Sequence, residues 1–125
     1  MFLIAAAVAV GGCGLQRGPG SSEVTITVTR DFGSRLVTVV RYRHVSGSDT
    51  AIGLLRRSIS VRTAPDGGDV AAIDGVPATP GRTAWSLYVN GLRADAGPAA
   101  TIVHSGDRIW WDLHPVGTPT LAVVG

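Results

Sequence analysis

The chain has a single cysteine, no lysine and few aromatic side chains, and each shortage excludes a class of protein. Cys13 has no second cysteine with which to form an internal disulfide, so packing of apolar side chains must stabilise the fold. All 11 basic side chains are arginine, and they are spread from Arg17 to Arg108 among nine acids. With a formal net charge of only +2 and no basic cluster, we expect no nucleic-acid partner.

No apolar run is long enough to span a bilayer as a helix, which needs about 20 residues. The N-terminal run MFLIAAAVAV matches the apolar region of a secretory signal, and Gly11, Gly12 and Cys13 follow it. The stretch from Val10 to Cys13 resembles the lipobox of bacterial lipoproteins, whose cysteine thiol receives a diacylglyceryl group. It predicts a protein anchored by Cys13 to the extracytoplasmic face of the bacterial membrane. An ordinary signal peptide, or a buried core segment, is the alternative.

Three parts of the chain follow from this interpretation. Residues 1–12 are the expected signal peptide, and residues 13–22 hold the lipidated Cys13 and a flexible tether rich in Gly and Ser. Residues 23–125 form one domain, because no internal repeat or second composition shift is present. Hydrophobic residues make up 45% and charged residues 16% of the chain, which is typical of a globular protein, and we expect a monomer.

Alternation of apolar and polar residues predicts mostly strands. The first is the Val-Thr-Ile-Thr-Val pattern from Val24, and a turn at residues 31–34 leads into the second. The expected later strands are Leu36–Tyr42, Val61–Thr63, Val70–Ile73, Trp85–Val89, Leu92–Ala94 and Arg108–Leu113, with an edge strand over Thr118–Val124. Residues 76–83 are rich in Pro and Gly and are expected to form a loop.

One short helix and three hairpin turns complete the expected elements. The first turn, the Gly-rich residues 65–68, joins Val61–Thr63 to Val70–Ile73. Helical spacing of Ile52, Leu55 and Ile59 predicts a helix over residues 51–58, with Asp49 or Thr50 as its N-cap. Asn90-Gly91 predicts a type I′ hairpin turn, which needs positive φ at both positions. Residues 105–107 are expected to be the turn of a last hairpin.

Two of these segments carry a family resemblance. Residues 85–91 (WSLYVNG) and 106–111 (GDRIWW) resemble motifs of the transcobalamin C-terminal-like domain of bacterial surface proteins, in the same order and spacing. The resemblance covers about residues 24–113. It implies an α+β fold of β-grasp-like (ubiquitin-like) type, in which a mixed sheet with several hairpins packs on a single helix. In the vertebrate transporters that name the family this domain closes over cobalamin, so the resemblance admits a cobalamin-like ligand and implies no other cofactor.

The strand from Arg108 supplies the candidate binding face. Ile109, Trp111 and Leu113 are expected to enter the core, and the intervening side chains to point the other way. That second face offers an aromatic platform for a ring or sugar, with polar groups to orient it. The candidate ligand-binding residues are Tyr88, Asn90, Arg108, Trp110, Asp112 and His114. The alternative is a solvated face, or one covered by the C-terminal segment.

No catalytic or metal-binding pattern is present. His44, His104 and His114 lie in separate elements without the spacing of a zinc site. No Gly-x-Ser-x-Gly elbow occurs, and Asp107 is expected to be a turn residue. The sequence therefore predicts a non-catalytic binding module for a small ring-bearing ligand or a glycan. The alternative is a cell-envelope protein that contacts other proteins and binds no small molecule.

Overall fold

The computed structural model describes residues 22–65 and 69–117. The expected signal peptide, Cys13 and the expected edge strand over Thr118–Val124 lie outside the described residues. Within them, no helix is long and apolar enough to cross a membrane.

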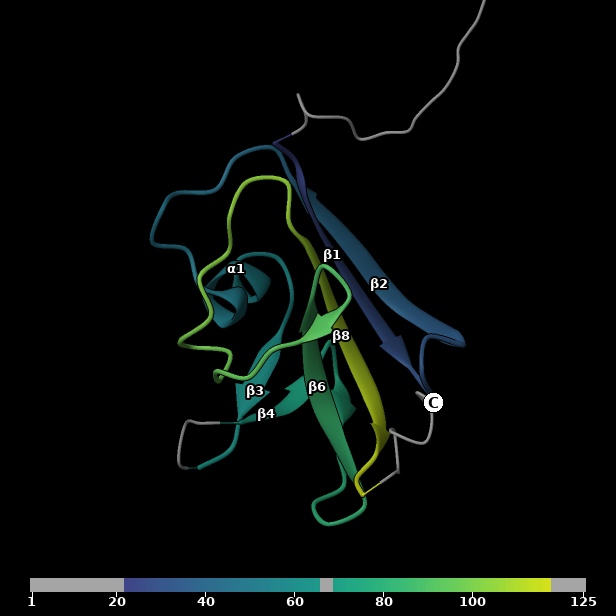
Figure 1. Ribbon diagram of the computed structural model, residues 1–125. Coiled ribbons are helices and arrows are strands. Elements are labelled where there is room, and N and C mark those ends of the chain that lie inside the picture. The colour runs from purple at the N-terminus through teal and green to yellow at the C-terminus, as the bar shows by residue number, and fades with distance from the viewer. Residues whose placement is uncertain (1–21, 66–68, 118–125) are drawn as a thin grey trace, which may run out of the picture.

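A five-stranded sheet forms most of the molecule (Figure 1). Its strands are β1 (Val24–Arg30), β2 (Arg35–Tyr42), β6 (Thr83–Val89), β7 (Leu92–Arg93) and β8 (Arg108–Pro115). Their order is β2-β1-β8-β6-β7, with β1 and β8 parallel in the interior of the sheet and the other neighbours antiparallel. The sheet is therefore mixed, as the sequence predicted.

A second, three-stranded antiparallel sheet lies beside it, in the order β3 (Val61–Thr63), β4 (Val70–Ile73) and β5 (Val76–Pro77). The predicted β3–β4 hairpin is confirmed. The expectation of a loop over residues 76–83 is wrong at both ends. Residues 76 and 77 form β5, and residue 83 is the first residue of β6. A tight turn at Asp74 and Gly75, with φ of 53° and 78°, brings the chain back onto β4 despite the proline in β5.

The predicted helix is α1 (Ala51–Arg56), and Thr50 is its N-cap, with its Oγ1 accepting a hydrogen bond from Gly53 N at 3.0 Å. Asp49, the other candidate cap, instead forms an ion pair with Arg57 at 2.6 Å. The helix ends before Ser58, the expected end, because the amides of residues 57 and 58 bond three residues back and tighten the last turn.

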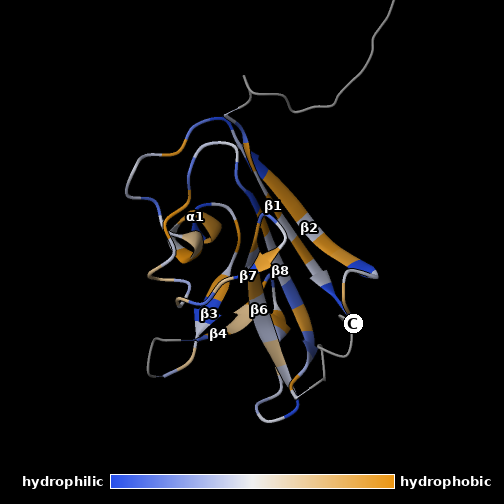
Figure 2. Cartoon of the chain, viewed as in Figure 1, coloured by the Kyte–Doolittle hydropathy of each residue, from blue (hydrophilic) through white to orange (hydrophobic). Residues whose placement is uncertain are grey.

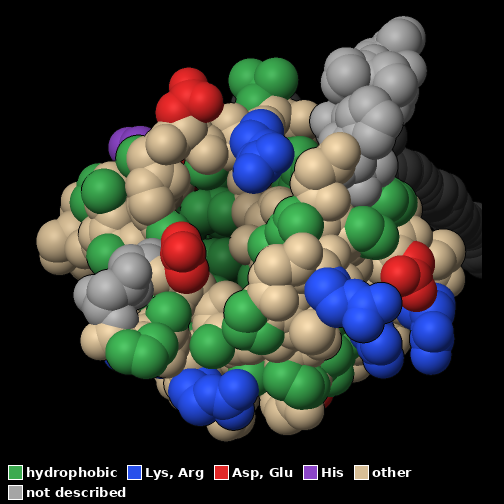
Figure 3. All heavy atoms as spheres, turned by 90° about the horizontal axis from the view of Figure 1, so that it is seen from below, with side chains coloured by type: hydrophobic (Ala, Val, Ile, Leu, Met, Phe, Trp, Pro, Cys, Tyr) green, Lys and Arg blue, Asp and Glu red, His purple; other side chains and the backbone are tan. Residues whose placement is uncertain are grey.

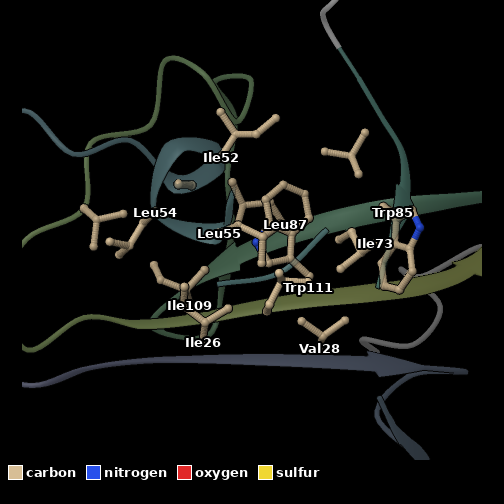
Figure 4. Close-up of a cluster of buried hydrophobic side chains, with 14 of the residues drawn as sticks. Ile26, Val28, Ile52, Leu54, Leu55, Ile73, Trp85, Leu87, Ile109 and Trp111 are labelled. Atoms are coloured by element: carbon tan, nitrogen blue, oxygen red, sulfur yellow. The ribbon is translucent and has the colours of Figure 1, made fainter. Parts of the chain in front are cut away.

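The core lies between α1 and one face of the five-stranded sheet (Figures 1 and 4). Leu54 and Leu55 of α1 pack with Ile26 of β1 and with Ile109 and Trp111 of β8, all of which are at most 1% exposed. Figure 2 shows that hydrophobic residues make up most of α1. The predicted inward face of residues 109, 111 and 113 is thus confirmed.

One predicted pairing is wrong. Residues 105 and 106 do form a turn, but the segment before them contributes no strand beside β8. Ile102 makes only an isolated bridge to Thr50. Strand β8 pairs instead with β1 and β6, which come from distant parts of the sequence. The described residues therefore form a mixed α+β arrangement of two sheets and one short helix.

Candidate functional site

The predicted aromatic pair forms on the face of the sheet that points away from α1. Tyr88 of β6 lies directly opposite Trp110 of β8, and their rings stack with centroids 4.6 Å apart. The indole N–H of Trp110 donates to Thr29 Oγ1 of β1 at 2.7 Å. We call the surface around Tyr88 and Trp110 the aromatic face. Because the two half-buried rings pack against each other, the aromatic face is a filled surface at this point.

Asp112 is fully buried beneath this face and accepts four hydrogen bonds. The hydroxyl of Thr29 donates to it at 2.6 Å, and the amides of Phe32 and Gly33 donate at 3.0 Å each. His114 Nδ1 lies 2.6 Å from its second oxygen. The carboxylate is therefore fully engaged within the protein, which corrects the expectation that it lies on an open face.

His114 is covered by the turn between β1 and β2. Its ring stacks against that of Phe32, with centroids 4.3 Å apart and planes 13° apart. Asp31, Phe32 and Gly33 all have positive φ, of 54°, 58° and 84°, a backbone shape that costs energy for the two non-glycine residues. The amide bonds to Asp112 hold this turn closed over the sheet, so His114 also lies at a buried position rather than on an open face.

Ser86, His114 and Asp112 form a series of side-chain contacts that the sequence did not reveal. Ser86 Oγ lies 3.4 Å from His114 Nε2, and a cavity of about 140 Å³ borders both residues. Serine hydrolases use this order of groups, but they present the serine on a strained turn between a strand and a helix. Ser86 instead sits in the middle of β6, paired with Asp112 across the sheet. The contacts join β6, β8 and the β1–β2 turn.

Asn90 and Arg108 occupy the opposite end of β6 and β8. Asn90 has φ of 51° and Gly91 of 86°, which confirms the predicted type I′ turn. The Asn90 amide donates to Asp107 Oδ1 at 2.9 Å, and its oxygen accepts from Arg108 N at 2.8 Å. Asp107 is a turn residue, as predicted, and also accepts from His104 N. Asn90 thus joins two turns beside a hollow of about 430 Å³, and the side chain of Arg108 is exposed.

A groove lies elsewhere, between β4 and the edge of β6. Two adjoining cavities of about 400 Å³ and about 160 Å³ form it. We call it the inter-sheet groove and define it by the residues that border both cavities: Asp69, Val70, Trp85, Ser86 and Arg93. Seen from below, the molecule is hollowed, with hydrophobic side chains inside the hollow and charged side chains around it (Figure 3).

Two charged side chains border both cavities of the groove, and a third, Asp95, borders the smaller one. Arg93 and Asp69 are exposed, and neither forms an ion pair within the described part of the chain. Sequence reasoning missed both. A weak indication was available, because Ala-Asp-Ala-Gly-Pro after Arg93 is unfavourable for a strand and implies that β7 is short. A short β7 leaves the neighbouring edge of β6 open.

Metal ligation finds no support in the described residues. No group of three or more His, Cys, Asp or Glu side chains is placed to hold a metal ion there.

Two solved structures resemble this fold. A candidate metal-binding protein from Ruminococcus gnavus ATCC 29149 is 15% identical over 75% of this chain and 97% of its own, with a TM-score of 0.56. Haptocorrin, solved in complex with Cbi, is 16% identical over 84% of this chain but only 27% of its own, with a TM-score of 0.53. At these identities the likeness concerns the fold alone.

A search of curated proteins gave no match. The family model described as a domain of unknown function, DUF4430, matches residues 48–115. Together with the likeness to haptocorrin, this confirms the transcobalamin C-terminal-like resemblance of the two aromatic motifs. Because the match spans more than half of the chain, the protein belongs to the DUF4430 family.

Proposed function

We propose that this protein is a non-catalytic binding module, anchored by Cys13 to the extracytoplasmic face of the bacterial membrane, and that it binds its ligand in the inter-sheet groove. The groove carries the proposal, because its larger cavity of about 400 Å³ falls within the range of ligand sites. Apolar walls with a few polar groups at the border are typical of such sites, and Arg93 and Asp69 supply the polar groups.

We also propose that residues 23–125 form a β-grasp-like domain. Support comes from the strand order β2-β1-β8-β6-β7, with a parallel pair in its interior, and from the single helix on one face. In this arrangement the three-stranded sheet is an addition beside β6, and it supplies the second wall of the groove.

A ring-bearing, cobalamin-like ligand is the first candidate for the groove. The family resemblance supports it, as does the likeness to haptocorrin, which was solved with Cbi. Trp85 borders both cavities, and its indole N–H donates to Val76 O at 3.1 Å and so fixes the ring beside the groove.

Contact with another envelope protein is the second candidate, and the aromatic face favours it. Phe32, 50% exposed, lies in the turn that passes close to Trp110 at Gly33, and Leu36, 66% exposed, lies on the edge strand β2, two strands from β8. Exposed apolar side chains around a packed aromatic pair are more typical of a protein contact than of a small-molecule pocket.

Purification of the full chain from membranes in mild detergent, followed by native mass spectrometry, tests the location of the site. We expect a bound species in the wild type and at least a tenfold loss of it in Arg93→Glu. Arg41→Glu is the matched control, because Arg41 is an exposed arginine on β2, at the opposite edge of the same sheet. Loss in a Tyr88→Ala/Trp110→Ala double variant but not in Arg93→Glu would move the site to the aromatic face.

The three indole N–H groups can report where a ligand binds. Trp85 donates to Val76 O, Trp110 donates to Thr29 Oγ1, and Trp111 Nε1 is buried without a partner in the described chain. Their NMR signals therefore differ and report separate places. A cobalamin-like ligand in the groove would move the Trp85 signal on titration with cobalamin and leave that of Trp110 in place. If no indole signal responds, the cobalamin-like ligand is refuted.

A further inference from the structure

The edge of β6 beside the groove is open around Trp85. It is covered before that point by the bond from Thr83 N to Thr79 O at 2.9 Å, and after it by β7. The four consecutive residues Thr83, Ala84, Trp85 and Ser86 all border the larger cavity, although their side chains point alternately to the two faces of the sheet. A cavity that borders successive residues of a strand runs along the edge of that strand. Strand β7 covers this edge only at Tyr88 and Val89.

The phase of the sheet hydrogen bonds shows which backbone groups face the groove. Asn90 N donates to Arg108 O, and Val116 N donates to Arg82 O, so even-numbered residues of this segment bond toward β8. The odd-numbered residues therefore direct their amides and carbonyls to the other edge. Leu87 O there accepts from Ala94 N at 2.9 Å. The N–H and C=O of Trp85 face the groove, and no strand of the described chain pairs with them.

We propose that the inter-sheet groove binds an extended peptide, which adds to the open edge of β6 as a further strand. The inference rests on the proposed groove function and names the ligand class. A donor and an acceptor from one residue, both directed to the same side, match one residue of an extended chain. A ring ligand offers no such repeated pair. Main-chain bonds supply the affinity in this mode, and the flanking pockets select side chains.

Two further observations agree with a peptide. Arg93 and Asp69 border the groove as unpaired charges of opposite sign, which suits a segment carrying an acidic and a basic side chain. Trp111, only 1% exposed, borders the smaller cavity, and its indole N–H has no acceptor within the described residues. Buried donors are nearly always satisfied, and a peptide carbonyl is a suitable acceptor.

Two capped heptapeptides, Asp-Thr-Val-Thr-Val-Thr-Lys and its charge-exchanged partner Lys-Thr-Val-Thr-Val-Thr-Asp, serve as probes for the two strand directions. With the full-length protein in mild detergent and a millimolar peptide concentration, we expect at least one to slow hydrogen exchange of the Trp85 amide by about tenfold. N-methylation of alternate peptide residues removes the donors on one edge only. One of the two N-methylated forms should lose binding by at least tenfold, although its side chains are unchanged.

Charge variants identify the orientation. Arg93→Glu should lower the affinity for the preferred peptide by roughly fivefold. Arg41→Glu, the matched control, should keep the wild-type affinity. If neither peptide protects the Trp85 amide, or if both N-methylated forms bind as well as the parent, strand addition is wrong. The proposed function of the groove is tested separately, by native mass spectrometry of the membrane-purified protein. If Arg93→Glu removes a bound species there, the groove remains the binding site even if neither peptide binds.

Discussion

The carboxylate of Asp112 joins three elements through four hydrogen bonds. Thr29 belongs to β1, Phe32 and Gly33 to the turn that follows it, and His114 to β8 itself. A buried charge is costly unless hydrogen bonds replace its hydration, and Asp112 has a partner for each direction in which its oxygens can accept. The same bonds stabilise the positive φ angles of the turn.

We expect Asp112→Asn to destabilise the protein by about 2–4 kcal/mol. The amide has one accepting oxygen in place of two, and its NH₂ group would face at least one of the donors now bonded to the carboxylate. Urea unfolding of the domain measures the difference as a shift of the midpoint at constant m value.

Asp74→Asn is the matched control for this prediction. Asp74 is exposed in a turn with φ of 53°, which asparagine also tolerates, so its stability should change by less than about 0.5 kcal/mol. Equal stabilities of the two variants would show that the four bonds to Asp112 contribute little.

At the level of residues, the alternation rule was sufficient to assign faces but not exposure. It placed Tyr88 and Trp110 on one face and Trp111 in the core, and the structure agrees. It could not show that Asp112 and His114 are covered, because the cover is Phe32, some 80 residues away in the chain. A phenylalanine within a polar turn was the one sequence feature that pointed to a packing role.

Among the elements, those defined by local sequence were predicted and those defined by distant partners were not. The helix, the β3–β4 hairpin and the Asn90-Gly91 turn each depend on a few neighbouring residues. The side-chain alternation of β8 is the same whichever strand lies beside it, so its parallel pairing with β1 left no trace in the pattern.

The turn between β6 and β7 provides a test of local backbone energetics. Gly91 has φ of 86°, and a Cβ added there would meet no atom within 4 Å, so only backbone strain opposes a side chain. We expect Gly91→Ala to lower the stability by about 1–2 kcal/mol. Gly97 has equal space without positive φ, and Gly97→Ala should change the stability by a few tenths of a kcal/mol at most. Thermal unfolding of the two variants decides, and a larger loss for Gly97→Ala would contradict the assigned turn.

At the scale of the whole molecule, the inter-sheet groove lies between two sheets. The segments that form its walls are separated in the sequence and meet only in the folded chain. Its walls come from β4 on one side and from β6 and the segment after β7 on the other. None of the three shows a binding motif, since the site is made by an open strand edge and by what lies opposite it. The sequence therefore predicted a binding module but placed its binding residues on the aromatic face.

The proposed anchor determines where such a groove would act. Nine residues separate Cys13 from Glu23, and a fully extended segment of that length spans about 30 Å. A groove held so close to the lipid surface would meet ligands of the cell envelope rather than of the surrounding medium. A freely released domain would not have this restriction, so lipidation and the choice of ligand are linked.

Cys13→Ala tests the anchor directly. Two acyl chains give stable membrane binding, and Cys13→Ala removes the thiol that would carry them. We therefore expect the wild type to partition into the detergent phase of Triton X-114 and Cys13→Ala into the aqueous phase. Ser21→Ala, within the same tether, is the control and should remain in the detergent phase. Mass spectrometry of the wild type should show acyl groups on an N-terminal Cys13, and an unmodified chain that still begins at Met1 would refute the anchor.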